Sequence, residues 1–293
     1  MAKQNPEARV EANYPSRTAL RVATRRAAHQ VLDDPRIFDD PLALRVLGLT
    51  PAILRELEQT QQEDTNLSRV LRASLAARSR YAEDELRLAI EQGITQYVVL
   101  GAGLDTFAYR NPYSEIALHV FEVDHPATQE WKRTCLAKAG IPIPATLTYA
   151  PIDFEKQTIA DGLRQAGFDT TRRTFFSWLG VTMYLSQQAI EATLQFVASM
   201  PTGSWIVFDY MISPSLLGPQ ARLAFDRLSA HVALAGEPFR TCFEPSRLRQ
   251  NLLAMGFGQA EDIGPDAMDA RYFQSRSDNL HVGKLAHVMN ARV

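Results

Sequence analysis

The sequence predicts an α/β fold in which a doubly wound parallel sheet of seven strands follows a helical region. From residue 96 onward, short apolar runs alternate with amphipathic stretches, a pattern typical of a parallel sheet with crossover helices. The residues before that point show helical periodicity instead. A chain of 293 residues with 46% apolar side chains has enough material for one large domain or two small ones.

The first 93 residues divide into an arm and a helical region. Residues 1–15 are polar and lack periodicity, so we expect a flexible arm. Ser16 is the predicted N-cap of the first helix, and Asp40 before Pro41 predicts the start of another. A long amphipathic run then ends at Gly93. We expect residues 16–93 to form a helical cap.

Residues 94–293 form the predicted α/β domain, which acts with the cap as one functional unit. Its candidate strands are residues 97–101, 118–124, 147–153, 174–181, 204–211, 258–263 and 281–289. Ser186 and Pro201 delimit one crossover helix, and Pro245 and Gly256 delimit another. Residues 212–243 are too many for a simple connection, so we expect a helical insertion there.

Composition and charge exclude several classes of partner. The 31 basic and 33 acidic side chains nearly cancel, so a broad nucleic-acid-binding surface is not expected. No apolar run approaches the roughly 20 residues of a membrane span, and the start of the chain resembles no signal segment. The two cysteines lie far apart and the six histidines are scattered. We therefore expect a cytoplasmic protein without a metal or a disulfide framework.

The stretch "VVLGAGLDTFAYR", residues 98–110, predicts a ligand-binding turn after the first strand. Gly101 and Gly103 allow a sharp turn and close approach of a ligand at the carboxyl end of the sheet. A dinucleotide fingerprint would have a third glycine at the position of Thr106. The alternative is a plain tight turn after a core strand.

An acid at the end of the second strand strengthens the prediction of a ligand. Asp124 follows the glycines by about twenty residues, the distance at which an acid can accept both ribose hydroxyls of an adenosine. Glu122 lies on the same strand face and is the competing candidate. Asp124 is preferred because the last residue of a strand projects over the ligand.

Two further strand ends carry weaker signals. Asp153 and Phe154 follow the third strand, where they can contact an adenine, although Asp153 can equally cap the next helix. Trp178 and Tyr184 flank Gly180 after the fourth strand, where they either wall a pocket or fill the core.

These motifs, "QYVVLGAGLDTFAYR" followed by "HVFEVDHP", resemble those of the S-adenosylmethionine-dependent methyltransferases of the leucine carboxyl methyltransferase type. "RIFDDPLA" and "SWLGVTMYL" are similar to motifs of its bacterial branch of small-molecule O-methyltransferases. The resemblance covers roughly residues 16–290. It implies a class I methyltransferase fold, Rossmann-like and seven-stranded, with a helical cap. It also implies S-adenosylmethionine as cofactor and S-adenosylhomocysteine as product.

The resemblance also assigns cofactor-binding residues. Arg78 matches the arginine that pairs with the methionine carboxylate, and Asp124 matches the ribose acid. The matching cofactor-loop and adenine positions are Gly101, Ala102, Gly103, Asp153 and Phe154. Leu179 departs from the family, because the carboxyl methyltransferases that act on protein have a glutamate there. This departure favours the small-molecule branch.

Methyl transfer from a sulfonium is an in-line displacement that needs alignment more than catalytic side chains. A carboxylate acceptor is already ionised near pH 7, whereas a phenol gains from a base. The candidates for a base or an orienting group are His231, Tyr184 and Tyr210. The candidates for holding an anionic acceptor are Arg21, Arg25 and Arg240.

We therefore expect an O-methyltransferase that acts on a small organic acceptor, as a monomer or a homodimer. Two alternatives remain at this point. One is a nicotinamide-dependent oxidoreductase, against which Thr106 counts, and the other is a non-catalytic binding protein that keeps the cofactor fold.

Overall fold

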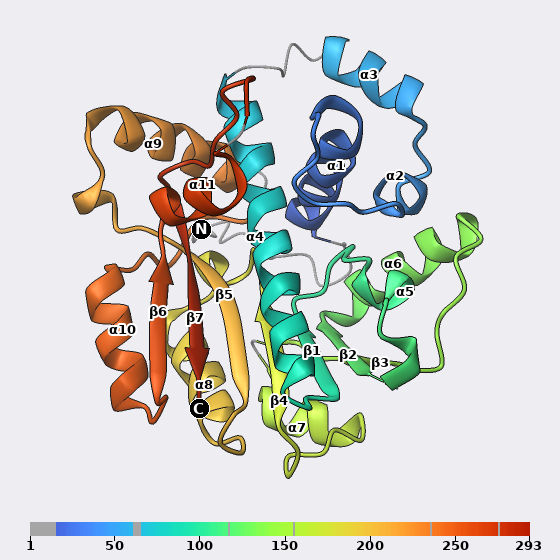
Figure 1. Cartoon of the computed structure of the whole chain (residues 1–293), viewed down its shortest axis with the longest axis vertical. Helices are drawn as coiled ribbons and strands as arrows, with labels where there is room; N and C mark the ends of the chain where they lie inside the picture. The colour runs from blue at the N-terminus through green and yellow to red at the C-terminus, as the bar shows by residue number, and fades with distance from the viewer. Residues whose placement is uncertain (1–15, 61–65, 117, 155, 235, 275) are drawn as a thin grey trace, which may run out of the picture.

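The computed structural model describes residues 16–60, 66–116, 118–154, 156–234, 236–274 and 276–293 (Figure 1). The predicted arm at residues 1–15 lies outside these ranges. The strands are β1 (Gln96–Leu100), β2 (His119–Asp124), β3 (Leu147–Pro151), β4 (Thr174–Trp178), β5 (Trp205–Met211), β6 (Gln259–Ile263) and β7 (Ala286–Arg292). They form one sheet in the order β3-β2-β1-β4-β5-β7-β6.

The helices cover both faces of this sheet and its carboxyl end. The α-helices are α1 (Arg17–Leu32), α2 (Ala43–Val46), α3 (Pro51–Thr60), α4 (Asn66–Glu91), α5 (Phe107–Arg110), α6 (Pro126–Lys138), α7 (Ile159–Gln165), α8 (Gln187–Ala198), α9 (Pro219–Leu234), α10 (Pro245–Ala254) and α11 (Pro265–Tyr272). Three 3₁₀ turns are η1 (Ser114–Ile116), η2 (Thr182–Tyr184) and η3 (Pro214–Leu216).

The strand order confirms the doubly wound sheet. β1 pairs in parallel with β2 on one side and with β4 on the other, so the chain winds outward in both directions from this point. Open α/β sheets bind ligands outside the carboxyl ends of the strands at such a switch point. The loop after β1 therefore occupies the expected ligand position.

The last strand differs from the prediction in position. β7 runs antiparallel to both β5 and β6, a direction that the strand pattern of the sequence did not assign. After β6, α11 and the following loop remain at the carboxyl end of the sheet, so β7 enters from that end. Residues 281–285 were expected in this strand, but Val282 N–H donates to Asp269 and Gly283 N–H donates to Ser74, 2.9 and 2.8 Å away. These bonds hold the segment against α11 and α4, and the strand begins at residue 286.

Alternating side chains of each strand are buried in two separate clusters. Val98 and Leu100 of β1 pack with α7, α8 and α10, while Tyr97 and Val99 pack with α4 and α11. Because both faces of the sheet are covered, the strands are apolar on both sides.

The helical cap lies at the carboxyl end of the sheet. Figure 1 shows α1, α2 and α3 grouped beyond the end toward which β6 points. Ser16 caps α1 as expected, with its side chain accepting from Ala19 N–H at 3.1 Å. The second helix begins at Ala43 rather than directly after Asp40: the carboxylate of Asp40 accepts from Leu42 N–H, and α2 covers four residues. Unlike α1–α3, α4 runs along the sheet and contacts β4 and β5.

The expected insertion at residues 212–243 contains η3 and one long helix, α9. Figure 1 shows α9 at the same end of the molecule as the cap. None of the described helices combines the length and apolar character that crossing a membrane requires.

Candidate active site

The loop after β1 is built on left-handed glycines in tight contact with neighbouring elements. Gly101 has φ +67° and Gly103 has φ +45°, a region that favours glycine. A Cβ on Gly101 would lie 2.3 Å from Val181 Cγ2, and one on Gly103 would lie 3.2 Å from Ala19 Cβ of α1. A side chain at Gly101 would therefore overlap Val181, just before η2, and one at Gly103 would press on Ala19 of the cap.

Asp124 ties the end of β2 to this loop. Its carboxylate accepts from Gly103 N–H at 2.6 Å and from His125 N–H at 2.7 Å. Burial raises the pKa of Asp124, and these two bonds oppose the increase. The competing candidate, Glu122, is buried in an ion pair with Lys132 at 2.7 Å. Only Asp124 of the two acids lines the cavity beside the loop.

That first cavity has a volume of about 300 Å³ and lies between the glycine loop, α1 and the segment after β4. Most of the predicted cofactor residues line it. They are Arg78, Gly101, Ala102, Gly103, Asp124 and Phe154. Leu179 and Arg240 line it as well.

Asp153 does not line the first cavity. Its carboxylate, which is 20% exposed, forms an ion pair with Lys156 at 2.8 Å and lies 3.9 Å from Nε2 of His125, a residue that does line the cavity. It does not cap the next helix either, because Thr158 accepts from Asp161 N–H at the start of α7. Of the adenine contacts implied by the resemblance, only Phe154 is brought to the cavity.

Arg78 of α4 is held at the carboxyl end of β5. It forms a buried ion pair with Asp209, whose other oxygen accepts from Gly180 N–H at 2.6 Å. A Cβ on Gly180 would lie 2.7 Å from Arg78 Nη2 and would displace the guanidinium, and the φ of +75° at this position also favours glycine. Arg78 Nε is buried and has no hydrogen-bond partner among the described residues. The guanidinium therefore has a donor available for an anionic group of a ligand.

A second cavity, of about 590 Å³, adjoins the first. The residues that line both are Thr18, Val22, Arg78, Gly180 and Tyr184. Arg21, Arg25 and His231 line the second cavity. Tyr210 lines neither cavity: it is buried, and its hydroxyl donates to Asp262 at 2.5 Å. The structure thus brings every predicted base or acceptor residue to the cavities except Tyr210.

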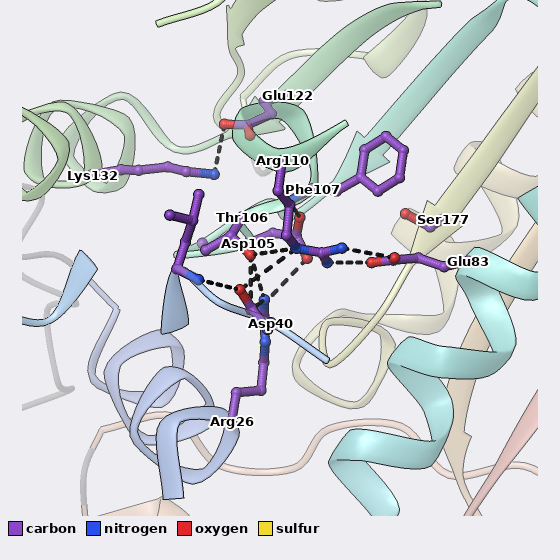
Figure 2. A network of polar contacts seen from close by, with 12 residues as sticks. Arg26, Asp40, Glu83, Asp105, Thr106, Phe107, Arg110, Glu122, Lys132 and Ser177 are labelled. Carbon is purple, nitrogen blue, oxygen red and sulfur yellow. Dashed lines mark hydrogen bonds and ion pairs between the residues drawn. The ribbon is translucent and has the colours of Figure 1, made fainter. Parts of the chain in front are cut away.

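A buried polar network joins the cap to the loop after β1, and sequence reasoning missed it. Figure 2 shows Arg26 of α1 and Arg110 of α5 converging on Asp40. Arg110 also forms a two-pronged pair with Glu83 of α4. The Thr106 hydroxyl donates to Asp40 at 2.8 Å and accepts from Arg26 and Arg110, both at 3.0 Å.

The network gives Thr106 a role at the position where a dinucleotide fingerprint would have its third glycine. Thr106 is the central hydroxyl of the network, so a glycine there would remove a partner of three charged groups. Burial alone would raise the pKa of Asp40, but the charges of Arg26 and Arg110 lower it. Arg26 and Glu83 also line the first cavity, so the same network shapes its wall. The only sequence signal for it was the departure from glycine at position 106.

The described residues contain no cluster of three or more His, Cys, Asp or Glu side chains that could hold a metal ion.

Comparisons with known proteins give the family. A model of the leucine carboxyl methyltransferase family matches residues 19–198. The Bacillus subtilis (strain 168) protein named "Putative S-adenosyl-L-methionine-dependent methyltransferase YktD" is 34% identical over 95% of this chain and 98% of its own length. A Mycobacterium marinum (strain ATCC BAA-535 / M) protein, named in the same way but without YktD, is 33% identical over 75% of each chain.

Two solved structures share the fold at lower identity. A DUF574 family protein from Streptomyces avermitilis MA-4680 covers 97% of this chain and 99% of its own, with a TM-score of 0.54 and 15% identity. A protein from Thermobifida fusca YX covers 85% of this chain and 91% of its own, with a TM-score of 0.54 and 20% identity.

The first cavity fits S-adenosylmethionine on observations of this chain. The glycine loop leaves room for close approach, Asp124 stands at the strand end where ribose hydroxyls bind, and the buried Nε of Arg78 is available to a carboxylate. With the sheet order of a class I methyltransferase and the relatives described above, these features identify the chain as an S-adenosylmethionine-dependent methyltransferase that belongs to the leucine carboxyl methyltransferase family.

Proposed function

We propose that this methyltransferase transfers the methyl group to an oxygen, either a carboxylate or a hydroxyl, of a small organic acceptor. The observation that supports the proposal most is the pair of adjoining cavities with a common wall at Arg78, Gly180 and Tyr184. One cavity suits the cofactor, and the other has the volume of a pocket for a small molecule. A shared wall is the arrangement that two reactants in one displacement require.

In this proposal the first cavity holds the cofactor through three groups of the chain. Asp124 would accept the ribose hydroxyls, Arg78 Nε would donate to the methionine carboxylate, and Phe154 would cover the adenine. Bound S-adenosylmethionine supplies an activated methyl group on a sulfonium sulfur. The cap contributes the exclusion of water, because α1 lines both cavities.

The side chains at the shared wall orient the acceptor rather than activate it. Burial raises the pKa of Tyr184 to about 12, so its hydroxyl remains protonated at neutral pH and acts as a hydrogen-bond donor, not as a base. A carboxylate acceptor needs no base. For a hydroxyl acceptor, His231 on α9 is the candidate base because it lines the second cavity.

The test uses S-adenosylmethionine labelled in its methyl group with panels of aromatic and aliphatic carboxylic acids, phenols, amines and thiols. We expect label in the acids or the phenols. Mild alkali then releases the label as methanol from esters but not from ethers, which separates the two acceptor types. Transfer only to nitrogen or sulfur would overturn the proposal.

The variant His231→Ala tests in the same assay whether His231 acts as a base. The variant is expected to bind S-adenosylhomocysteine as the wild type does. If its turnover of every accepted phenol also equals that of the wild type, His231 is not a base.

A further inference from the structure

We infer that the second cavity binds an apolar organic anion and that Arg21 of α1 binds its anionic group. The inference rests on the proposed function, because it names the class of acceptor that the second cavity takes. On this inference, Arg21 makes the cavity bind an acid more tightly than the uncharged analogue of that acid.

The cavity wall is suited to an apolar body. Large apolar side chains of α4, η2, α9 and the loop after α9 line it, among them Leu67, Val70, Leu71, Met183, Leu228 and Phe239. A volume of about 590 Å³ exceeds that of the cofactor cavity. Ligand pockets of this size are mostly apolar and carry a few polar groups that fix orientation.

The charges on the wall favour an anion. The only acidic side chain among the described residues that line the cavity is Asp209, and it is already paired with Arg78. Arg21 and Lys284 also line the cavity, and neither forms an ion pair with a described residue. The wall therefore carries positive charge that its own carboxylate does not neutralise.

Arg21 is the cation best placed to use this charge. Thr18, Arg21, Val22 and Arg25 follow at i, i+3, i+4 and i+7, so they form one face of α1, and all four line the cavity. Thr18 and Val22 belong to the wall shared with the cofactor cavity, which puts Arg21 beside the junction.

The hydrogen bonding of Arg21 is also incomplete. Its Nη1 is buried and has no hydrogen-bond partner among the described residues. A buried donor without a partner costs free energy, which an anionic ligand would recover by accepting the bond. Lys284, in contrast, is exposed, so its charge is screened by water.

The experiment measures binding to the full chain saturated with S-adenosylhomocysteine, by calorimetric titration. The probes are two acids, 2-naphthoate and octanoate, each with its uncharged amide. The variants are Arg21→Gln, Arg21→Lys and, as a matched control, Arg17→Gln. Arg17 is an exposed arginine on the same helix and lines neither cavity.

We expect wild type and Arg17→Gln to bind at least one acid tenfold or more tightly than its amide. Arg21→Gln should abolish this preference without changing the affinity for the amide or for S-adenosylhomocysteine. Arg21→Lys should keep part of it, which preserves the test if the glutamine variant fails to fold. Equal binding of acids and amides by wild type, or an unchanged preference in the Arg21 variants, would overturn the inference.

The labelled-methyl assay separates this inference from the function on which it rests. Acids that bind through Arg21 but never receive a methyl group would contradict the proposed function alone. Methyl transfer to neutral phenols, without any preference for acids in binding, would contradict the inference alone.

Discussion

Arg78 and Asp209 form a buried ion pair that joins helix α4 to strand β5 at the junction of the two cavities. Arg78 Nη1 binds one carboxylate oxygen of Asp209, and Gly180 N–H donates to the other oxygen. Arg78 is thereby held in place before any ligand arrives. Such preorganisation reduces the entropy cost of binding.

Breaking this pair is expected to destabilise the protein strongly. Arg78→Gln or Asp209→Asn leaves a buried charge without its partner, so each variant should lose about 3–5 kcal/mol of the free energy of unfolding. The double variant should lose less than the sum, because no lone charge remains. Urea denaturation of the four proteins measures the coupling.

The exposed pair Arg222 and Asp226 on α9 is the control for that cycle. Its coupling should be about 0.2–1 kcal/mol. A coupling between Arg78 and Asp209 no larger than this would show that the buried pair does not organise the junction.

Asp124 and Asp153 should differ in their effect on cofactor affinity. Asp124→Ala removes a carboxylate that lines the first cavity, so binding of S-adenosylhomocysteine should weaken by about 1.5–3 kcal/mol. Asp153→Ala removes one that does not line it, and the affinity should change by less than about 0.5 kcal/mol. Calorimetric titration measures the affinity of the two variants for S-adenosylhomocysteine. Equal losses of affinity would show that Asp153 also contributes to the cofactor site.

Asp124→Asn distinguishes a ligand contact from a role in the loop. The single amide oxygen can accept from Gly103 N–H or from His125 N–H but not from both, so the variant loses the charge and one of the two bonds that tie Asp124 to the backbone, whereas alanine loses both bonds. The affinity of Asp124→Asn for S-adenosylhomocysteine should therefore lie between that of wild type and that of Asp124→Ala.

The fold could be predicted largely because its signals are local. Apolar runs and the caps at Ser16 and Ser186 depend only on neighbouring residues, and both helices begin where expected. The direction of β7 could not be predicted, because the polarity of a strand depends on the end of the sheet to which the chain returns. The periodicity of residues 281–289 holds no information about that end.

The contacts within the site could be predicted only where they are local. The glycine loop and Asp124 are separated by about one strand and its connection, so their spacing could be recognised. The contacts of Thr106 with Arg26 and Asp40 span 80 and 66 residues, and those of Arg78 with Asp209 span 131. The spacing of residues in the sequence does not reveal contacts between residues so far apart. The second cavity is lined almost entirely by residues from such distant segments.

Thr106→Val tests the central hydroxyl of the cap network. Valine has nearly the same shape but cannot donate to Asp40 or accept from Arg26 and Arg110. Because these partners are buried, the free energy of unfolding should fall by about 1–3 kcal/mol. Thr134→Val, at an exposed position of α6, should change it by less than about 0.5 kcal/mol. Similar values for the two variants would deny Thr106 this role.

The lowered pKa of Asp33 predicts how the contact between α1 and α4 depends on pH. Burial would raise its pKa, but hydrogen bonds from His29 and Arg72 and the charge of Arg72 lower it to about 2, against an ordinary value of 3.8. A lowered carboxyl pKa stabilises the folded state above the unfolded value, and this stabilisation is lost as the pH falls from about 4 toward 2. The contribution is about 2 kcal/mol.

Asp33→Asn lacks this titration. Between pH 5 and pH 2 the wild type should therefore lose about 2 kcal/mol more of its free energy of unfolding than the variant. Denaturant titrations at several pH values measure the difference, and parallel losses in the two proteins would assign the acid sensitivity to other carboxylates.

Glu237, in the loop after α9, closes the first cavity against the start of α1. Its carboxylate accepts from Ser16 Oγ at 2.8 Å and from Thr18 N–H at 2.9 Å, and it also binds the Thr18 hydroxyl. Ser16, Thr18 and Glu237 all line the cavity, so this contact is part of its wall. The negative charge at a helix N-terminus strengthens it.

Glu237→Gln weakens this closure without opening the rest of the site. The amide has only one accepting oxygen and no charge, which should cost about 1.5 kcal/mol at the contact. If the cofactor leaves between α1 and this loop, S-adenosylhomocysteine should dissociate about tenfold faster, with a smaller change in association. Stopped-flow displacement measures both rates. Glu244→Gln, at an exposed residue that lines neither cavity, should leave them unchanged. Equal dissociation rates in wild type and Glu237→Gln would mean that the product leaves by another route and that α1 remains docked throughout turnover.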